Sequence, residues 1–371
     1  MAEKKNQHFV PVCYLKMFAL EGERCIRVYN LKRKKFIESA SIRDQASKPY
    51  FYGKDLKVEN NLSKLEGDFS RLLKDIRNGK FPERHEKQQP YSFIQRLSRD
   101  YKALLFFIAL TDFRNPVRTQ QFGIISKILK KEYRASDEYI NLKKDGEELI
   151  SGYTGSNPYL LKGLELVKKG IKKWEEDDDE VLASLAFVSR VTDSISDLNF
   201  KVLINETAIP FITSDYPVVN YNQWAEQIAK IMGGGYSSTG AQFFVPISDR
   251  IQILIYDEKI YHLEDMTSNV ASVGIRGVNQ INTLQYLNCQ SNVYGNERMT
   301  EAYIEFLREK AAPFNRANDV NVSKIESVFS NGRGGSSAIN VLKTNLDLSF
   351  IKFTLYAKGF RLSGDEAYQR K

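Results

Sequence analysis

The chain has 371 residues, of which 42% are hydrophobic and 12% aromatic, with a formal net charge of +8 and a pI of about 9.1. This apolar content is enough for a sizeable core and excludes an intrinsically disordered chain. The basic balance favours a polyanionic partner such as nucleic acid, but an ordinary basic protein has the same balance.

The cysteines and the apolar segments of the sequence indicate in which cellular compartment the chain is expected. The three cysteines are widely spaced and form no CxxC pair, so we expect neither a disulfide framework nor a zinc site. We expect Cys13 and Cys25 to be buried free thiols in a reducing, cytoplasmic compartment. The opening residues lack the apolar stretch of a signal peptide, and no window approaches eighteen consecutive apolar residues, so no membrane-spanning segment is expected.

The first predicted element is a β-hairpin. Residues 24–29 and 34–39 alternate between apolar and polar side chains, and a turn-like segment separates them. Helical spacing follows over residues 56–79, where an Asn-Gly pair ends the helix. A strongly apolar helix that begins with a proline is expected over residues 90–113, at the centre of the core.

Further helices are expected in the middle of the chain. Pro116 fits the first turn of a helix that runs to about Arg134. Asp137 and Asn157 are expected to start two more, and another ends at about Ser194.

The pattern after residue 200 changes to strands. Two pairs are predicted, residues 200–205 with 208–213 and residues 241–246 with 250–256. Helices over residues 276–294 and 298–312 follow, then a Gly-rich loop over residues 330–337 and a late strand over residues 348–357. This order predicts an α+β fold, in which a large helical core of about residues 56–196 packs with a mostly antiparallel sheet formed by the N-terminal hairpin and the strands after residue 200.

The first candidate site residue is His8, one of three histidines, with Asn6 and Tyr14 close by in the sequence. Histidine acts as acid, base or metal ligand near neutral pH. Alternatively, His8 donates a hydrogen bond to a backbone carbonyl and fixes the terminus. On residue type alone we favour this second interpretation.

A second candidate, Asp215, follows an apolar strand in the segment Thr213-Ser214-Asp215. A carboxylate at a strand end is placed to bind a metal, orient a histidine or contact a ligand. Equally, it closes a turn by accepting hydrogen bonds from backbone N–H groups. Glu59 and Glu66 share one helix face two turns apart. They join a metal cluster only if other elements fill the gap, and a solvated face is the simpler interpretation.

Arg114 and Arg118 lie at the break between two helices. An arginine there binds phosphate or carboxylate, or it caps the last carbonyls of the first helix. Residues 233–240 lack the Lys-Ser/Thr of a P-loop, and no GxSxG, HExxH or GxGxxG motif is present.

The opening NQHFVPVCYLKMF resembles the signature of a mainly bacterial family known as domain of unknown function four-two-three-eight. Its later motifs have counterparts in the same order, namely Arg114-Asn115-Pro116, Thr213 to Val218, Pro246-Ile247-Ser248, and a helix with Asn279, Asn282 and Gln290. Tyr216 stands where the family usually has Asn. The resemblance covers residues 6 to about 295. It implies a shared fold and no settled activity, and it implies that His8, Arg114 and Asp215 converge on one site.

We therefore expect one α+β domain over residues 1–295, with the helix, Gly/Ser loop and strand of residues 296–371 packed on it. The favoured function is a metal-dependent phosphodiesterase or nuclease, a phage-defence or toxin-like effector acting on nucleic acid or nucleotide. His8, Asp215 and Arg114 would be catalytic, and Asp215, Glu66 and Glu59 would hold Mg²⁺ or Mn²⁺. The expected ligand-binding residues are Asn6, Tyr14, Arg118, Thr213, Ser214, Ser248 and Asn282.

Two alternatives stay open. In one, the same polar cluster holds a nucleotide or other small anion without catalysis, in a regulatory or defence module with a protein partner or a second copy. In the other, the motifs only fasten the terminus to the core.

Overall fold

The computed structural model describes residues 5–22, 24–84, 97–121, 123–124, 181, 184–185, 187–229, 235–263, 268–314, 316 and 344–359. These residues form helices and several mostly antiparallel sheets, which confirms the predicted α+β fold. No helix in this part of the chain combines the length and the apolar character needed to span a bilayer.

The largest sheet has five strands in the order β11-β5-β9-β8-β7. Their bounds are β5 Asn199–Asn205, β7 Val219–Tyr221, β8 Gln242–Pro246, β9 Ile251–Tyr256 and β11 Val270–Val273. The β8–β9 pair is antiparallel, as predicted, and β11 runs parallel to β5. Every residue of β8 and β9 is buried, so both faces of the sheet are covered.

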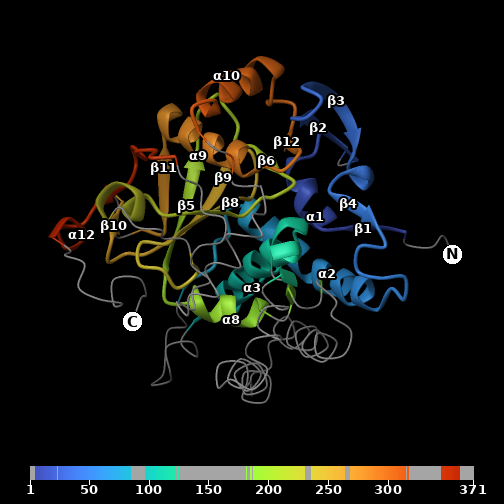
Figure 1. Cartoon of the computed structure of the whole chain (residues 1–371), viewed down its shortest axis with the longest axis horizontal. Helices are drawn as coiled ribbons and strands as arrows, with labels where there is room; N and C mark the ends of the chain where they lie inside the picture. Colours follow the sequence, from blue (N-terminus) through green and yellow to red (C-terminus); the bar gives the residue numbers. More distant parts are fainter. Residues whose placement is uncertain are drawn as a thin grey trace.

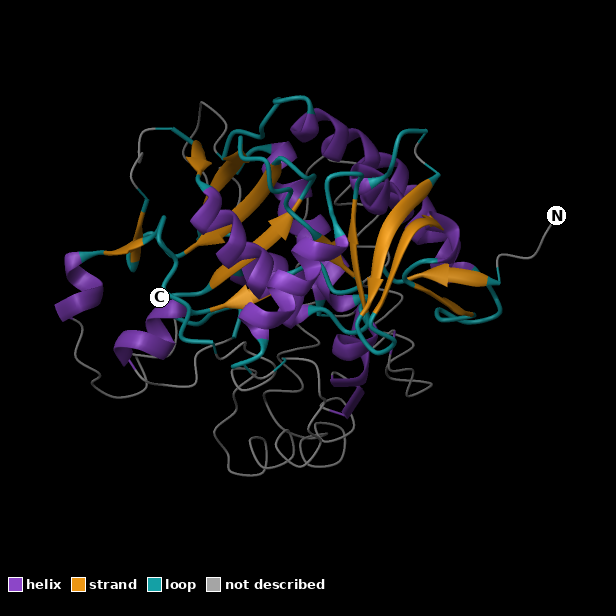
Figure 2. Ribbon diagram, turned by 90° about the horizontal axis from the view of Figure 1, so that it is seen from above, coloured by secondary structure: helices purple, strands orange, loops and turns teal. Residues whose placement is uncertain are grey.

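A second sheet has four strands in the order β3-β2-β12-β6. Their bounds are β2 Cys25–Asn30, β3 Lys35–Ser41, β6 Thr213–Ser214 and β12 Asn292–Gly295. The predicted N-terminal hairpin is confirmed as the antiparallel pair β2–β3. Two short antiparallel pairs complete the strands, β1 Asn6–His8 with β4 Ser47–Pro49 and β10 Tyr261–His262 with β13 Lys352–Phe353. Figure 2 shows the two larger sheets in opposite halves of the molecule.

The helices lie between and around the sheets (Figure 1). The described residues include α1 Val12–Leu15, α2 Lys57–Arg77, α3 Arg99–Phe113, α8 Val188–Ser194, α9 Ile275–Asn288, α10 Glu301–Ala311 and α12 Leu355–Gly359. Single turns are η1 Lys16–Phe18, η2 Ile42–Asp44 and η4 Ala225–Ala229. The predicted end of α2 is confirmed, since Asn78 caps it and Gly79 has a φ of 80°.

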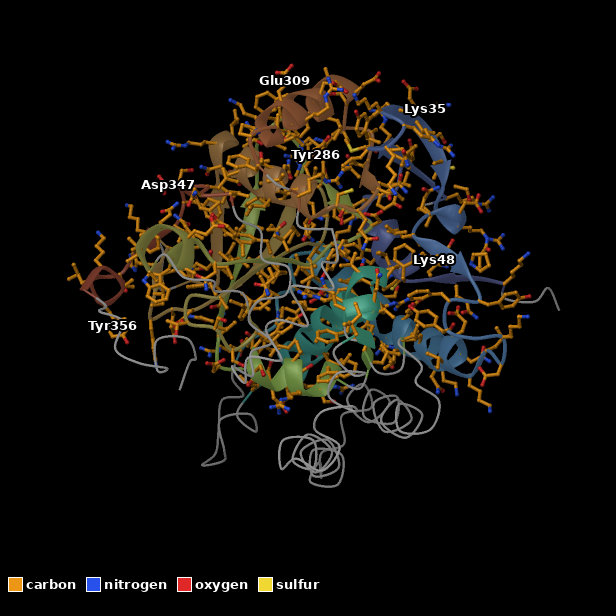
Figure 3. All side chains as sticks on the ribbon, viewed as in Figure 1. Lys35, Lys48, Tyr286, Glu309, Asp347 and Tyr356 are labelled. Atoms are coloured by element: carbon orange, nitrogen blue, oxygen red, sulfur yellow. The ribbon has the colours of Figure 1, made fainter. Side chains whose placement is uncertain are left out.

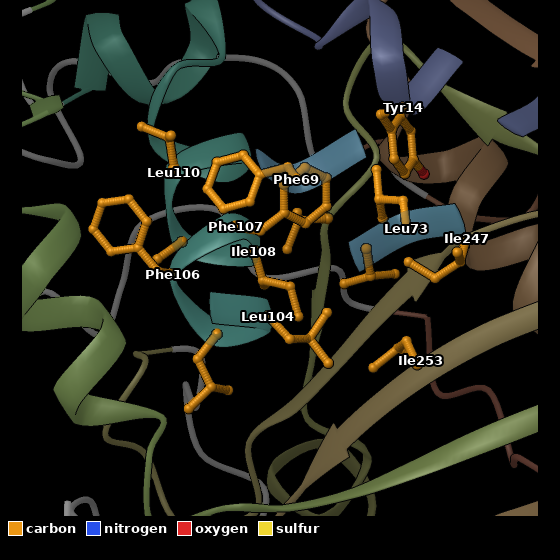
Figure 4. Close-up of a cluster of buried hydrophobic side chains, with 14 of the residues drawn as sticks. Tyr14, Phe69, Leu73, Leu104, Phe106, Phe107, Ile108, Leu110, Ile247 and Ile253 are labelled. Atoms are coloured by element: carbon orange, nitrogen blue, oxygen red, sulfur yellow. The ribbon is translucent and has the colours of Figure 1, made fainter. Parts of the chain in front are cut away.

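Two hydrophobic cores hold these elements. The first joins α1, α2 and α3 to one face of the five-stranded sheet, and Figure 4 shows its centre, where the Phe69 and Phe107 rings meet edge to face at 5.1 Å. α3 is buried almost all round, as its composition predicts. The second core lies on the other face of the sheet and includes α9 and α10, and Leu348 and Ile351 of the C-terminal part join it.

Four predicted elements differ in extent or pairing. α3 begins at Arg99, because Ser98 is extended and caps the helix by accepting a hydrogen bond from the N–H of Tyr101. β5 does not pair with the following segment, since β6 pairs with β12 in the other sheet. α9 ends at Asn288, and β12 replaces its predicted last turns. The late strand shrinks to β13, after which α12 begins.

Some predictions lie outside the described residues. These are the helix starts at Pro90, Asp137 and Asn157 and the Gly-rich loop over residues 330–337. The helix that starts at Pro116 is confirmed for residues 116–121 and 123–124.

Candidate functional site

Arg114 joins three segments that are far apart in the sequence. It is the residue after α3, and its side chain is 1% exposed. Its Nε donates to the hydroxyl of Tyr52 at 3.0 Å, and its Nη2 donates to Glu66 Oε1 at 2.9 Å and to the backbone oxygen of His8. The guanidinium therefore turns to β1, to α2 and to the loop before α2, and not to the last carbonyls of α3.

One nitrogen of this guanidinium is left over. Among the described residues, Nη1 of Arg114 is buried and has no hydrogen-bond partner. Burial acts to lower the pKa of Arg114, but Tyr52 and Glu66 together raise it above its ordinary value. The group is a permanent cation, partly compensated by Glu66, with hydrogen-bonding capacity still unused.

His8 lies beside this cation and takes the role that we favoured from its residue type. Its Nε2 lies 3.1 Å from the backbone oxygen of Arg43, so Nε2 carries the proton. Burial lowers the pKa of His8, Glu66 opposes this shift, and Arg114 adds to it. At neutral pH the imidazole is therefore neutral, with its unprotonated nitrogen at Nδ1.

A pocket of about 280 Å³ lies between the α1–η1 segment and α2. It is lined by Val12, Cys13, Lys16, Met17, Glu66, Gly67, Ser70 and Lys74. Burial raises the pKa of the Cys13 thiol to about 12, so this thiol stays protonated and is a poor nucleophile. The pocket combines two lysines with apolar side chains and one carboxylate that binds the buried arginine.

Asp215 takes the second of its two predicted roles and closes a turn. Its side chain is buried, and Oδ1 accepts from the N–H of Gln290 at 2.8 Å and from Sγ of Cys289 at 3.5 Å. Oδ2 accepts from the N–H groups of Ser291 and Asn292 at 2.9 and 3.1 Å. Burial raises the pKa of Asp215, and these hydrogen bonds oppose that shift. The carboxylate thus has four donors and fixes the turn between α9 and β12.

The three predicted metal ligands do not form a cluster. Among the described residues, no group of three or more His, Cys, Asp and Glu is placed to hold a metal ion. Asp215 is occupied by backbone N–H groups, and Glu66 by Arg114. Glu59 lies on α2 with Glu66. Burial raises the pKa of the Tyr52 hydroxyl, and the negative charges of both carboxylates add to this rise. The Asp215 carboxylate thus faces residues 289–292, whereas Glu66 faces Arg114.

The three predicted catalytic residues converge only in part. His8, Arg114 and Glu66 form one cluster through the bonds described above. Asp215 adjoins it through its backbone, since Nδ2 of Asn115 donates to the oxygen of Asp215 at 2.7 Å. Its carboxylate faces residues 289–292 and not the cluster.

The predicted ligand-binding residues mostly bind other parts of the chain. The hydroxyl of Tyr14 lies 2.8 Å from Oγ1 of Thr213 and donates to the oxygen of Pro246 at 2.5 Å. The hydroxyl of Ser214 accepts a hydrogen bond from the side chain of Gln285, and that of Ser248 accepts one from the N–H of Arg250. The side chain of Asn282 forms hydrogen bonds with Pro210, Ile212 and Tyr303. Arg118 forms an ion pair with Asp112 at 3.3 Å. Asn6 is exposed at the start of β1.

Sequence reasoning missed the two lysines of the pocket. A signal for one of them was present, because Glu66, Ser70 and Lys74 recur every four residues and share a face of α2. Lys16 gave no such signal, since it follows a helix of four residues. Tyr52 gave no signal either, because its contact with Arg114, 62 residues later, depends on tertiary structure.

Comparison with known proteins identifies a family. Residues 6–299 match the model of a family described as "Protein of unknown function (DUF4238)". The chain belongs to this family. No curated protein and no solved structure matches the chain. The region that matches DUF4238 includes both walls of the pocket and the whole Arg114 cluster.

The DUF4238 motifs noted in the sequence meet in space. The opening motif bonds to the Thr-Ser-Asp segment and to the Pro-Ile-Ser turn through Tyr14. The Arg-x-Pro segment bonds to the Thr-Ser-Asp segment through Asn115, whose Oδ1 also accepts from Gln290 at 2.7 Å. The motifs of the family therefore build one hydrogen-bonded frame, against which the Arg114 cluster lies.

Proposed function

We propose that the chain binds a small phosphorylated ligand of the nucleotide class in the pocket between α1 and α2. The observation that carries this proposal is the placement of Lys16 and Lys74 in one pocket with Glu66, whose carboxylate binds the buried Arg114. The ligand class is that of the non-catalytic alternative that the sequence left open, but the site is this pocket and not the polar cluster of His8, Arg114 and Asp215.

The charges around the pocket favour an anion. Two lysines line it against one carboxylate, and that carboxylate is already paired with Arg114 at 2.9 Å. The local balance is therefore positive. A phosphate group accepts hydrogen bonds from lysine ammonium groups, and such charge-assisted bonds are among the strongest in proteins.

The remaining lining favours a ligand that is more than a bare ion. Val12 and Met17 offer apolar surface for a ring, and Ser70 and Glu66 offer a hydroxyl and a carboxylate to sugar or base donors. The volume of about 280 Å³ suits a small molecule and not a folded partner. A mononucleotide has the phosphate, the ring and the donors that this set recognises.

The metal-dependent phosphodiesterase that the sequence favours has less support. Its central carboxylate, Asp215, has four hydrogen-bond donors and is 4% exposed. A metal ion at Asp215 would have to displace the backbone N–H groups that fix the α9–β12 turn. Binding at the pocket requires no such rearrangement.

Titration calorimetry with mononucleotides, cyclic nucleotides and inorganic phosphate tests the proposal. We expect a nucleotide to bind the wild type, and Lys16→Ala and Lys74→Ala each to weaken binding by about tenfold, the value of one charge-assisted hydrogen bond. Lys64→Ala is the matched control, because Lys64 is exposed on α2 outside the pocket.

Two outcomes would overturn the proposal. In the first, no nucleotide binds the wild type. In the second, Lys16→Ala and Lys74→Ala bind the nucleotide as tightly as the control Lys64→Ala. Incubation of the same samples with nucleotides or RNA and Mn²⁺ tests the enzyme, since turnover that His8→Ala abolishes in a folded protein would favour a phosphodiesterase over a binding module.

A further inference from the structure

The positive charge of the chain is concentrated at its N-terminal end. Residues 1–57 contain 13 Lys and Arg against 6 Asp and Glu, whereas the whole chain has 54 against 46. These 57 residues therefore carry +7 of the net charge of +8. Such asymmetry indicates a polyanionic partner at one part of the surface.

Six of these basic residues, at positions 32–35, 48 and 54, belong to one continuous stretch of the chain from the β2–β3 turn to the loop before α2. The chain runs from β3 through η2 and β4 to the start of α2 along one side of the molecule, and Figure 3 shows Lys35 and Lys48 on that side. The turn between β2 and β3 and the first residue of β3 carry four exposed basic residues in a row, Lys32, Arg33, Lys34 and Lys35. This turn is ordered, because the N–H of Arg33 donates to Oδ1 of Asn30 at 2.8 Å.

Aromatic rings alternate with cations further along the same stretch of the chain. Tyr50 and Phe51 are half-buried between the exposed Lys48 and Lys54. Nζ of Lys48 lies 5.7 Å from the centre of the Phe51 ring, and Nζ of Lys54 lies 5.8 Å from the centre of the Tyr50 ring. Both distances are in the range of cation–π contacts.

These rings are held firmly from behind. Phe51 packs edge to face on Phe9 at 5.9 Å and on Tyr52 at 4.9 Å. Gln7 clamps the loop, since its side chain donates to the oxygen of Gly53 at 2.9 Å and accepts from the N–H of Tyr52 at 2.5 Å. The rings therefore present a pre-ordered, partly exposed surface, which lowers the entropy lost on binding.

We propose that this basic-aromatic flank, formed by residues 32–35, Lys48, Tyr50, Phe51 and Lys54, binds a single-stranded nucleic acid. The cations contact the phosphate backbone, and unpaired bases stack on the rings. A duplex offers the same phosphates but keeps its bases stacked, and an acidic peptide uses the cations but has no bases to stack. The combination of rings and cations thus selects a single strand. This surface is separate from the pocket.

Fluorescence anisotropy with labelled single-stranded RNA, single-stranded DNA and a duplex of equal length tests the proposal. Two variants of the full chain are compared. The first changes Lys32, Arg33, Lys34 and Lys35 to Ala and is expected to weaken single-strand binding at least tenfold and to flatten its salt dependence, by about 0.7 in log–log slope for each phosphate that is no longer neutralised. The second, Tyr50→Leu with Phe51→Leu, keeps the apolar packing and is expected to weaken single-strand binding several-fold with the salt slope unchanged.

A matched charge control keeps the result interpretable. Ala substitutions at Lys259, Lys310, Lys352 and Lys358 remove the same charge from exposed positions elsewhere and are expected to leave binding unchanged. The proposal fails if this control weakens binding as much as the hairpin variant, if the duplex binds as tightly as the single strand, or if polyglutamate competes as well as RNA. The double variant Lys16→Ala with Lys74→Ala should bind RNA normally, so failure of the pocket proposal and failure of this one are distinguishable.

Discussion

At the scale of single residues, the buried polar groups decide what the motifs of the sequence do in space. Arg114 and Asp215 both looked like candidates for ligand contact, and both are buried. They differ in how much of their hydrogen-bonding capacity is used. The Asp215 carboxylate accepts four hydrogen bonds, whereas Nη1 of Arg114 has no partner among the described residues. Residue type alone predicts neither state, since the partners of Asp215 lie more than seventy residues away.

His8 makes the stability of the fold depend on pH. Its folded-state pKa lies below the ordinary value of 6.5, chiefly because of burial. The unfolded chain therefore binds more protons just below pH 6.5, so the free energy of unfolding falls as the pH falls through that range. We expect His8→Gln, which keeps a donor for the oxygen of Arg43, to lose less stability than the wild type between about pH 7.5 and about pH 5.5 in urea titrations.

Asp193 complicates the wild-type profile and makes this comparison necessary. Burial raises the pKa of Asp193 to about 7, so the folded state holds a proton that the unfolded state has lost, and stability falls as the pH rises towards 7. This trend opposes that of His8 and is common to both proteins. Equal losses of stability in the wild type and in His8→Gln would show that His8 does not contribute.

At the scale of elements, local patterns predicted which segments form helices and strands better than where they end or what they pair with. The hairpin β2–β3 and the end of α2 follow from alternation and from an Asn-Gly pair. The pairing of β6 with β12 does not, because β6 has only two residues and its partner lies almost eighty residues later. The candidate site could not be predicted from local patterns for the same reason, since α1 and α2 form its walls and come together only in the folded chain.

The end of α9 is set by a contact from outside the helix. Residues 289–294 contain no Gly or Pro that would stop the helix, and helical spacing continues to residue 294. The Asp215 carboxylate instead accepts hydrogen bonds from the backbone N–H groups of Gln290, Ser291 and Asn292. Those groups would otherwise continue the helix.

Replacing this carboxylate tests its role in the turn. Asp215→Asn brings an NH₂ group against backbone N–H donors and leaves at least one donor buried without an acceptor. We expect the free energy of unfolding to fall by about 2–4 kcal/mol, as for other broken buried networks, with the same loss in the presence and absence of Mg²⁺ in urea titrations. A variant as stable as the wild type, or a loss seen only with Mg²⁺, would favour the metal-binding role instead.

At the scale of the whole molecule, one hydroxyl connects three layers. Tyr14 belongs to the first core, and its OH contacts Thr213 in the four-stranded sheet and Pro246 in the five-stranded sheet. Burial raises the pKa of Tyr14 well above its ordinary value, so the phenol stays protonated and able to donate. The opening motif thus couples the two halves of the molecule that Figure 2 shows apart.

This coupling predicts that the two cores unfold together. Tyr14→Phe keeps the packing and leaves the oxygen of Pro246 and the hydroxyl of Thr213 without this partner, at a cost of about 1–3 kcal/mol. Trp224 lies in the second core and donates to the oxygen of Ala357 at 3.2 Å, so its fluorescence reports on that core and on the C-terminal part. The chain has a second tryptophan, Trp174, so the measurements are made in a Trp174→Phe background in which Trp224 alone gives the signal. We expect Tyr14→Phe to lower the urea midpoint by the same amount whether unfolding is followed by Trp224 fluorescence or by far-UV circular dichroism. A shift in dichroism alone would mean that the cores unfold independently and that Tyr14 stabilises only the first.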